Sequence, residues 1–359
     1  AGVTHGLNVE SQSAPDVSIL RPHEVLIGVK SVAISWVDLL MTSGQYQHMP
    51  TLPYSPGLEY SGDVLWAGAD VPGEVSATGT KVFVDCFNTG PRTTGPYSQQ
   101  GGFASYAIAP AKAVHRIPGP LNYDQACNFA GGYETAFYCL VTRGRLAHGE
   151  TVMINGATGS TGLAAVQIAK RLGATVIATG RSMEKLAPLK EYGADHLVAV
   201  TDGDTRDIRR FREDVKALTG GRGVDVVYDG VGGAVSLESL RCCRFGARFL
   251  IVGWASTPLV AKGRGGRGAP NANQLPTNLV LMKGLEVLGS PMIIGTQHDP
   301  SIREPRLTQL LEWAEEGALT PLVTRTYPLS EAKEALLAKW RGEITGGAVL
   351  HPPALDWGQ

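Results

Sequence analysis

The stretch that decides the fold class, residues 155–162, reads Asn155-Gly156-Ala157-Thr158-Gly159-Ser160-Thr161-Gly162. An apolar, strand-like segment at 152–154 precedes it directly, and a helix-forming segment at 163–172 follows it. A glycine-rich turn between a strand and a helix presents backbone amides and the helix dipole to an anion. The stretch therefore predicts a dinucleotide phosphate loop whose geometry depends on Gly156, Gly159 and Gly162. A glycine-rich turn without a ligand is the alternative.

Strand-like and helix-like segments alternate on both sides of this loop. A helix is expected at 161–172, and such alternation is typical of βαβ units with a parallel sheet. About six strands suffice for a doubly wound sheet. The expected strands are at residues 152–154, 175–178, 196–200, 224–228, 248–252 and 285–288.

The first third of the chain has a different pattern, with short strands and frequent glycine and proline. Strands are expected at 25–34 and 79–84, in an antiparallel, barrel-like domain with few helices that extends to about residue 124. The tail predicts amphipathic helices near 306–316 and 329–340 and a final strand at 347–350. We expect this tail to rejoin the first domain.

Composition restricts the classes of function. Apolar residues make up 43% of the 359 residues and the net charge is -1, which favours a globular protein with a small-molecule substrate over binding to nucleic acid or a membrane surface. The five cysteines show no CxxC spacing and predict reduced thiols. Without an apolar run of about 18 residues or a signal-peptide pattern, a cytoplasmic location is expected. Residues 1–6 are small and polar and are expected to include a tag remnant or a processed end.

A short glycine- and arginine-rich stretch at 262–268 contains Arg264 and Arg267. It allows two interpretations, a surface loop or an arginine-glycine RNA-binding segment. A single short copy favours the surface loop, because glycine-rich segments bury little surface.

The residues after the second expected strand bear on the choice of dinucleotide. NAD-selective sites carry an acidic residue there, whereas this chain reads Gly180-Arg181-Ser182, with Lys185 one turn further on. A guanidinium is a forked, permanently charged donor that suits a 2′-phosphate. NADPH is therefore the expected cofactor, and a solvated basic helix start is the alternative.

Several blocks in order along the chain resemble the quinone oxidoreductase branch of the medium-chain dehydrogenase/reductase superfamily, from about Leu20 to Pro352. The resemblance implies a doubly wound Rossmann domain at 127–295, inserted into an interrupted GroES-like β-barrel catalytic domain at 1–126 and 296–359. It also implies an active cleft between the domains and a homodimer joined through 285–288. The blocks are residues 56–62 (PGLEYSG), 101–106 (GGFASY), 134–136 (ETA), 223–232 (GVDVVYDGVG) and Asn278-Leu279 before Lys283-Gly284.

Zinc-dependent members of the superfamily take ligands from Cys-x-x-Asp and Gly-His-Glu segments, and this chain departs from both. Ser35 and Leu58 stand at the matching positions, and the region 83–100 that matches the structural zinc lobe contains only Cys86. Serine is a poor zinc ligand and leucine is none, so no metal site is expected. Without a Lewis acid for an alkoxide, reduction of a quinone or of a conjugated double bond is favoured.

The candidates for catalysis follow from the same resemblance. Tyr46, in a Gly-x-Tyr segment, matches a cleft tyrosine that serves as proton donor in similar enoyl-thioester reductases, although a tyrosine that only shapes the pocket is equally compatible. Thr135 matches the threonine that contacts the nicotinamide carboxamide, or it bonds within its own helix. His48 is a further candidate, and a solvated histidine is the alternative.

The remaining candidates are expected to line the cofactor cleft, at or just after the carboxyl ends of the strands. Rival functions are an enoyl-thioester reductase, with Arg264 and Arg267 on a carrier phosphate, and a non-catalytic NADPH-binding or RNA-associated protein. Trp254 follows Gly253, and Met292 ends the segment 290–292. The full set of cofactor candidates is Asn155, Gly156, Thr158, Gly159, Ser160, Thr161, Gly162, Gly180, Arg181, Ser182, Lys185, Tyr192, Asp229, Val231, Trp254 and Met292.

Overall fold

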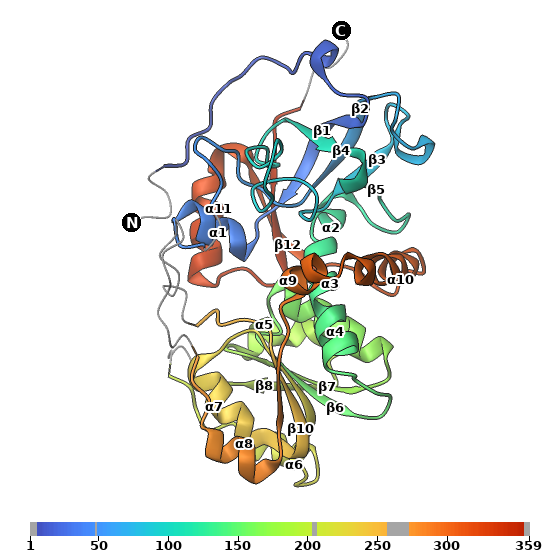
Figure 1. The fold of residues 1–359 in the computed structure, drawn as a ribbon. Coiled ribbons are helices and arrows are strands. Elements are labelled where there is room, and N and C mark those ends of the chain that lie inside the picture. Colours follow the sequence, from blue (N-terminus) through green and yellow to red (C-terminus); the bar gives the residue numbers. More distant parts are fainter. Residues whose placement is uncertain (1–5, 47–48, 203–206, 257–272, 355–359) are drawn as a thin grey trace. The chain divides into compact units, whose positions relative to one another are not determined.

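The computed structural model describes residues 6–46, 49–202, 207–256 and 273–354. His48, Arg264 and Arg267 therefore lie outside the described residues. The chain divides into two compact units (Figure 1). Described residues up to Gly131 and from Thr320 onward form the β unit, and those from Gly132 to Leu319 form the α/β unit.

The α/β unit is built on a parallel sheet that, over the described residues, has six strands in the order β11-β10-β9-β6-β7-β8. This is the order of a doubly wound nucleotide-binding sheet, so the predicted fold class is confirmed. All residues of the central strand β6 are buried, as expected for a parallel strand covered on both faces. The strands are β6 (Thr151–Asn155), β7 (Thr175–Gly180), β8 (His196–Ala199), β9 (Val224–Asp229), β10 (Cys243–Ile251) and β11 (Glu286–Gly289).

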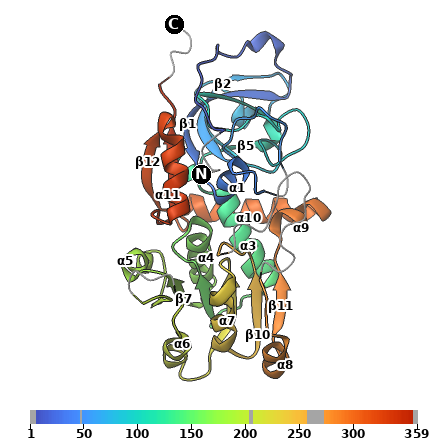
Figure 2. The ribbon, with the colours of Figure 1, turned by 90° about the vertical axis from the view of Figure 1, so that its left-hand side faces the viewer.

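The helices of the α/β unit connect and cover these strands (Figure 2). Helix α8 ends where Gly284 adopts the left-handed conformation, which satisfies the last carbonyls of the helix. The helix α3 continues into a π-helical segment, η4 (Tyr138–Arg143). The helices are α3 (Ala130–Phe137), α4 (Ser160–Arg171), α5 (Met183–Leu186), α6 (Arg212–Leu218), α7 (Gly233–Cys242), α8 (Thr277–Lys283), α9 (Met292–His298) and α10 (Arg303–Glu315).

The β unit contains a mainly antiparallel sheet of seven strands among the described residues, in the order β12-β13-β1-β2-β3-β5, with β4 also paired to β1. The tail rejoins this unit as expected, because β13 pairs with β1 through Val32 opposite Leu350. The strands are β1 (Glu24–Ala33), β2 (Tyr60–Ala67), β3 (Lys81–Val84), β4 (Tyr106–Pro110), β5 (Val114–Arg116), β12 (Val323–Pro328) and β13 (Gly347–His351).

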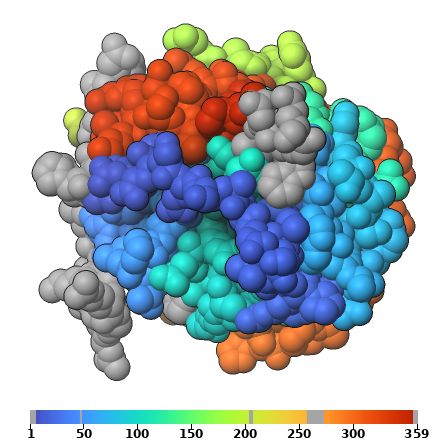
Figure 3. Space-filling model, turned by 90° about the horizontal axis from the view of Figure 1, so that it is seen from above, coloured from blue at the N-terminus to red at the C-terminus, as the bar shows by residue number. Residues whose placement is uncertain are grey.

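Three helices belong to the β unit: α1 (Trp36–Thr42), α2 (Tyr123–Ala126) and α11 (Ala332–Arg341). Leu336 and Ala335 of α11 are buried in the core beside strand residues such as Val25 and Tyr60. The early and late parts of the chain lie side by side on one face of this unit (Figure 3). Leu7 and Lys333 of α11 line the same hollow. The early and late parts of the chain thus share one core.

The unit boundaries fall later in the chain than the expected ones at 126/127 and 295/296. The structure changes unit after Gly131 and again after Leu319, so α9 and α10 belong to the α/β unit. The physical reason for the second shift is an ion pair between Arg306 of α10 and the buried Glu134 of α3.

The described helices include none with an apolar stretch long enough to cross a bilayer. All five cysteines are buried and none forms a disulfide.

Candidate functional site

The glycine-rich turn after β6 has the close backbone packing that a phosphate loop requires. Gly156 adopts a φ of +68°, a conformation that side chains disfavour. A Cβ on Gly162 would lie 2.3 Å from the carbonyl oxygen of Gly156, so only glycine lets the first turn of α4 approach the loop this closely. Gly159 has no comparably close neighbour, the nearest being the Gly156 carbonyl oxygen at 3.5 Å.

The start of helix α4 is open to an anion. Gly159 is its N-cap residue and brings no side chain to the first amides of the helix. The amides of Ser160, Thr161 and Gly162 occupy the first turn, where no intrahelical acceptor exists. These donors, together with the helix dipole, fit the pyrophosphate of a dinucleotide.

A buried polar network holds the strand ends behind this loop. The side chain of Asn155 donates to Asp229 at 3.2 Å and to Ser239 at 2.9 Å, and it accepts from Thr179 at 2.9 Å. Asn155 and Asp229 are 2% and 1% exposed. Both were expected near the cofactor, and the structure places their side chains in contacts that fix β6, β7 and β9 relative to one another.

Asp229 also shapes the turn that follows β9. Its carboxylate accepts from the amides of Val231 at 3.0 Å and Gly232 at 3.2 Å, and from the hydroxyl of Ser236. Asn273 accepts from the Gly233 amide at 3.1 Å and extends the network. Sequence reasoning missed Ser236, Ser239 and Asn273, since nothing in their local patterns marks them as partners of this aspartate.

The end of β7 lies against the phosphate loop. A Cβ on Gly180 would be 3.2 Å from the methyl carbon of Thr158, so two predicted site residues from different segments meet here. The next residue, Arg181, has an exposed side chain, and its carbonyl oxygen accepts from Thr201 at 2.7 Å. Ser182 begins the short helix α5, which carries Lys185. An exposed arginine therefore directly follows the strand end that meets the loop.

Other predicted cofactor residues fall into two groups. Val231 lies against the phosphate loop, 3.0 Å from where a Gly156 Cβ would be, and Trp254 is 46% exposed next to Gly232. Tyr192 is only partly exposed, and burial raises its pKa. Val231 is thus brought to the loop, whereas no described contact links Tyr192 to it.

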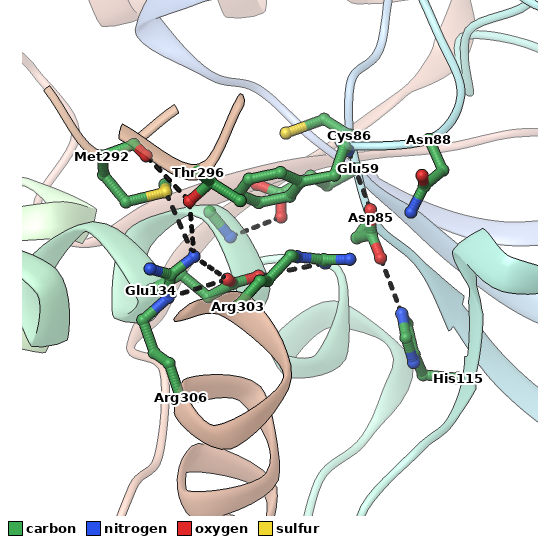
Figure 4. Close-up of polar contacts among 12 residues, drawn as sticks. Glu59, Asp85, Cys86, Asn88, His115, Glu134, Met292, Thr296, Arg303 and Arg306 are labelled. Carbon is green, nitrogen blue, oxygen red and sulfur yellow. Dashed lines mark hydrogen bonds and ion pairs between the residues drawn. The ribbon is translucent and has the colours of Figure 1, made fainter. Parts of the chain in front are cut away.

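A buried ion cluster surrounds Glu134, next to the candidate Thr135 (Figure 4). Glu134 is fully buried and accepts from Arg306 at 2.7 and 3.0 Å and from Arg303 at 3.1 Å. Arg306 also donates to Thr296 at 3.0 Å and contacts the sulfur of Met292 at 3.7 Å. The cluster ties α3, α9 and α10 together.

The same contacts decide the place of Met292, which was expected to line the cofactor cleft. Its side chain is 4% exposed and packs within this cluster. Thr135 remains partly exposed on α3. Sequence reasoning missed Glu134, Arg303 and Arg306 as a set, because 169 residues separate the first two.

In the β unit, the candidate Tyr46 belongs to an apolar cluster. It packs with Val37, Met49 and Tyr54 around the buried side chains of Met41, Leu58 and Cys86. An apolar side chain, that of Leu58, therefore occupies the position at which zinc-dependent relatives have a histidine.

Ser35 is used to start helix α1. Its hydroxyl donates to the carboxylate of Asp38 at 2.6 Å and accepts from the Asp38 amide at 3.0 Å, a reciprocal cap. Asp38 also accepts from the Gly57 amide at 3.0 Å, and burial raises its pKa. Across the described residues, no group of three or more His, Cys, Asp or Glu side chains is arranged to hold a metal.

Two family models match the chain: the alcohol dehydrogenase GroES-like domain over residues 21–119 and the zinc-binding dehydrogenase over residues 160–309. A quinone oxidoreductase-like protein 2 homolog from Nematostella vectensis is 30% identical over 334 residues, which cover 92% of this chain and 82% of the relative. The chain belongs to the quinone oxidoreductase-like branch of the medium-chain dehydrogenase/reductase superfamily. It is accordingly an oxidoreductase of that superfamily.

Solved structures of this superfamily cover nearly the whole chain. A mycobacterial protein solved in complex with NADPH has a TM-score of 0.74 and 25% identity, and covers 96% of this chain and 95% of its own. An NAD-dependent alcohol dehydrogenase has a TM-score of 0.76 and 27% identity, and covers 95% and 94%. Because one of these proteins was solved with NADPH and the other is named for NAD, the choice of dinucleotide depends on the residues of this chain.

Proposed function

We propose that this oxidoreductase transfers hydride from NADPH to a quinone or to the activated double bond of an α,β-unsaturated carbonyl compound, without zinc. The observation that carries the proposal is the combination of an open phosphate loop at α4 with an apolar cluster around Leu58 in the β unit. The loop suits a dinucleotide. Ser35 and Leu58 stand where a zinc-dependent alcohol dehydrogenase has its cysteine and histidine, so these two zinc ligands are missing.

The preference for NADPH over NADH rests on Arg181. Its exposed side chain follows β7, at the position where an acidic residue would bond the ribose hydroxyls of NADH. A guanidinium there stabilises a 2′-phosphate through charge-assisted hydrogen bonds. Lys185 on the next turn adds a second positive charge.

The residues of this chain would position the dinucleotide and supply the proton. The α4 amides and Gly156 would hold the pyrophosphate, and Thr135 would orient the nicotinamide carboxamide. When bound, NADPH supplies the hydride. Tyr46 would donate its phenolic proton to the carbonyl oxygen as negative charge develops there, and the cluster around Leu58 would keep that oxygen poorly hydrated.

A cofactor-oxidation assay tests the proposal. NADPH and NADH oxidation would be followed against quinones, enones and one enoyl thioester, with wild type, Tyr46→Phe and, as a matched control, Tyr327→Phe on β12. We expect turnover of a conjugated acceptor with NADPH, and a kcat about 100-fold lower for Tyr46→Phe alone. Tight NADPH binding without oxidation by any acceptor would replace the reductase proposal with a binding role.

A further inference from the structure

The guanidinium of Arg92, in the β-unit segment between β3 and β4, has an unusual environment. Its side chain is partly buried and follows the buried Pro91 in the chain. Among the described residues, its hydrogen-bond contact is Nη1 to the sulfur of Cys86 at 3.7 Å, and no carboxylate oxygen lies within the 4.0 Å of an ion pair. A thiol is a weak acceptor, so among the described residues the positive charge has no carboxylate in ion-pair contact.

The surroundings place this charge beside the proposed proton donor. Cys86, which Arg92 touches, packs in the same cluster as Leu58 and Tyr46. Burial lowers the pKa of Arg92, but Cys86, Tyr46 and Glu59 outweigh it, so the pKa stays above its ordinary value. The group is therefore permanently cationic.

Hydrogen-bonding capacity without a partner lies in the same part of the unit. Within the described parts of the chain, the buried hydroxyl of Thr89 has no hydrogen-bond partner, and the same holds for the buried side-chain carbonyl oxygen of Gln100. Gly90 lies near both Gln100 and Leu58. A Cβ on it would be 3.8 Å from the backbone carbonyl oxygen of Gln100 and 4.0 Å from the backbone carbonyl oxygen of Leu58. Among the described residues, the buried Thr89 hydroxyl is unsatisfied, which is costly in an apolar setting unless a ligand uses it, and the partly buried Arg92 has no carboxylate in ion-pair contact.

We infer that Arg92 binds a carboxylate of the acceptor, so that the substrates are conjugated carbonyl compounds or quinones that carry an acidic group. The inference rests on the proposed function and specifies its substrate class. The charge of Arg92 is permanent, and a substrate carboxylate offsets it in the bound ground state. An enolate oxygen, by contrast, would carry its charge only until Tyr46 protonates it, so it would not offset the charge of Arg92 in the bound ground state. The planar fork of the guanidinium matches a carboxylate in two parallel hydrogen bonds.

Binding of unreactive product analogues tests this site without turnover. Calorimetry would compare 3-benzoylpropionate and 4-oxopentanoate with their methyl esters, on wild type, Arg92→Gln and Arg92→Lys. Arg116→Gln, which removes an exposed charge from β5, is the matched control. We expect the acids to bind wild type about 10- to 100-fold more tightly than the esters. Arg92→Gln should abolish that ratio, Arg92→Lys should restore part of it, and Arg116→Gln should leave it unchanged.

Three outcomes would overturn the inference. One is the absence of any acid preference in wild type, and another is a preference that survives in Arg92→Gln. The third is a lower melting temperature for Arg92→Gln, since loss of an unpaired charge should leave stability unchanged or raise it.

A turnover arm separates this inference from the proposed function. With 3-benzoylacrylate and its methyl ester as acceptors, Arg92→Gln should raise KM for the acid and spare the ester. An equal fall in kcat for both would instead assign Arg92 to the developing oxyanion and overturn the carboxylate site. Acid-selective binding without NADPH oxidation would retain the site and reject the reductase proposal.

Discussion

Arg306 in the α/β unit is buried and Arg92 in the β unit is partly buried, and the partners of the two guanidinium groups differ. Arg306 is 3% exposed on its side chain and is satisfied by the carboxylate of Glu134 and the hydroxyl of Thr296. Among the residues that the structure describes, Arg92 has a single weak hydrogen-bond contact, with Cys86. The first arrangement stabilises a junction of helices, whereas the second leaves a charge available to a ligand. The partners of the two guanidinium groups therefore separate a structural cation from the one that we propose binds a ligand.

The largest effect that would test this comparison is expected at Glu134. Glu134→Ala leaves Arg306 and Arg303 without their shared carboxylate and should lower the free energy of unfolding by about 3–5 kcal/mol. Urea denaturation followed by circular dichroism measures it. Glu316→Ala, which breaks an exposed pair with Arg171, is the control and should cost less than about 1 kcal/mol. Equal losses in the two variants would mean that the buried cluster contributes no more than a surface pair.

A second prediction extends the comparison to the exposed Arg181. Arg181→Ala should weaken NADPH binding about 10- to 100-fold and leave NADH binding within about threefold, because only NADPH carries the 2′-phosphate. Fluorescence titration of both dinucleotides gives the ratio. Arg222→Ala, an exposed arginine before β9, is the control. A NADPH preference that Arg181→Ala leaves intact would move the determinant to another residue.

A third, smaller prediction concerns Lys339 of α11. Burial lowers its pKa to about 8, and the Asp38 carboxylate only partly opposes the shift. Between about pH 8 and 10.5 the unfolded chain binds more protons than the folded one, so this residue makes stability rise with pH there. Below pH 8 its charge is a cost.

Removing that amine should give a measurable signature. Lys339→Met should be more stable than wild type at pH 7, by on the order of 1 kcal/mol, with the difference shrinking towards pH 10.5. Thermal unfolding at several pH values measures the difference, and Lys333→Met on the exposed side of the same helix is the control. A pH-independent difference would assign the effect to packing.

Much of the fold follows from local pattern. The expected strand at 224–228 lies within β9 (Val224–Asp229), and the expected final strand at 347–350 lies within β13 (Gly347–His351). Strand β10 begins five residues before the expected 248, with a pairing irregularity between Cys243 and Arg248. Irregular pairing depends on the neighbouring strand, so no local pattern marks it.

The candidate site divides in the same way. The sequence determined the phosphate loop, because backbone conformation and close approach at Gly156 and Gly162 demand glycine wherever the rest of the chain lies. It also determined the absence of the zinc-type ligands at Ser35 and Leu58, since ligand chemistry belongs to the residue itself.

Only the tertiary structure decided which polar groups become partners. It placed Glu134 against Arg306, directed Asn155 to Asp229 and buried Met292. It also left Arg92 in contact with Cys86, with no carboxylate of the described residues at ion-pair distance. Hydrogen bonds and ion pairs act over about 3–4 Å, and such distances between residues far apart in the chain arise only when the elements have packed.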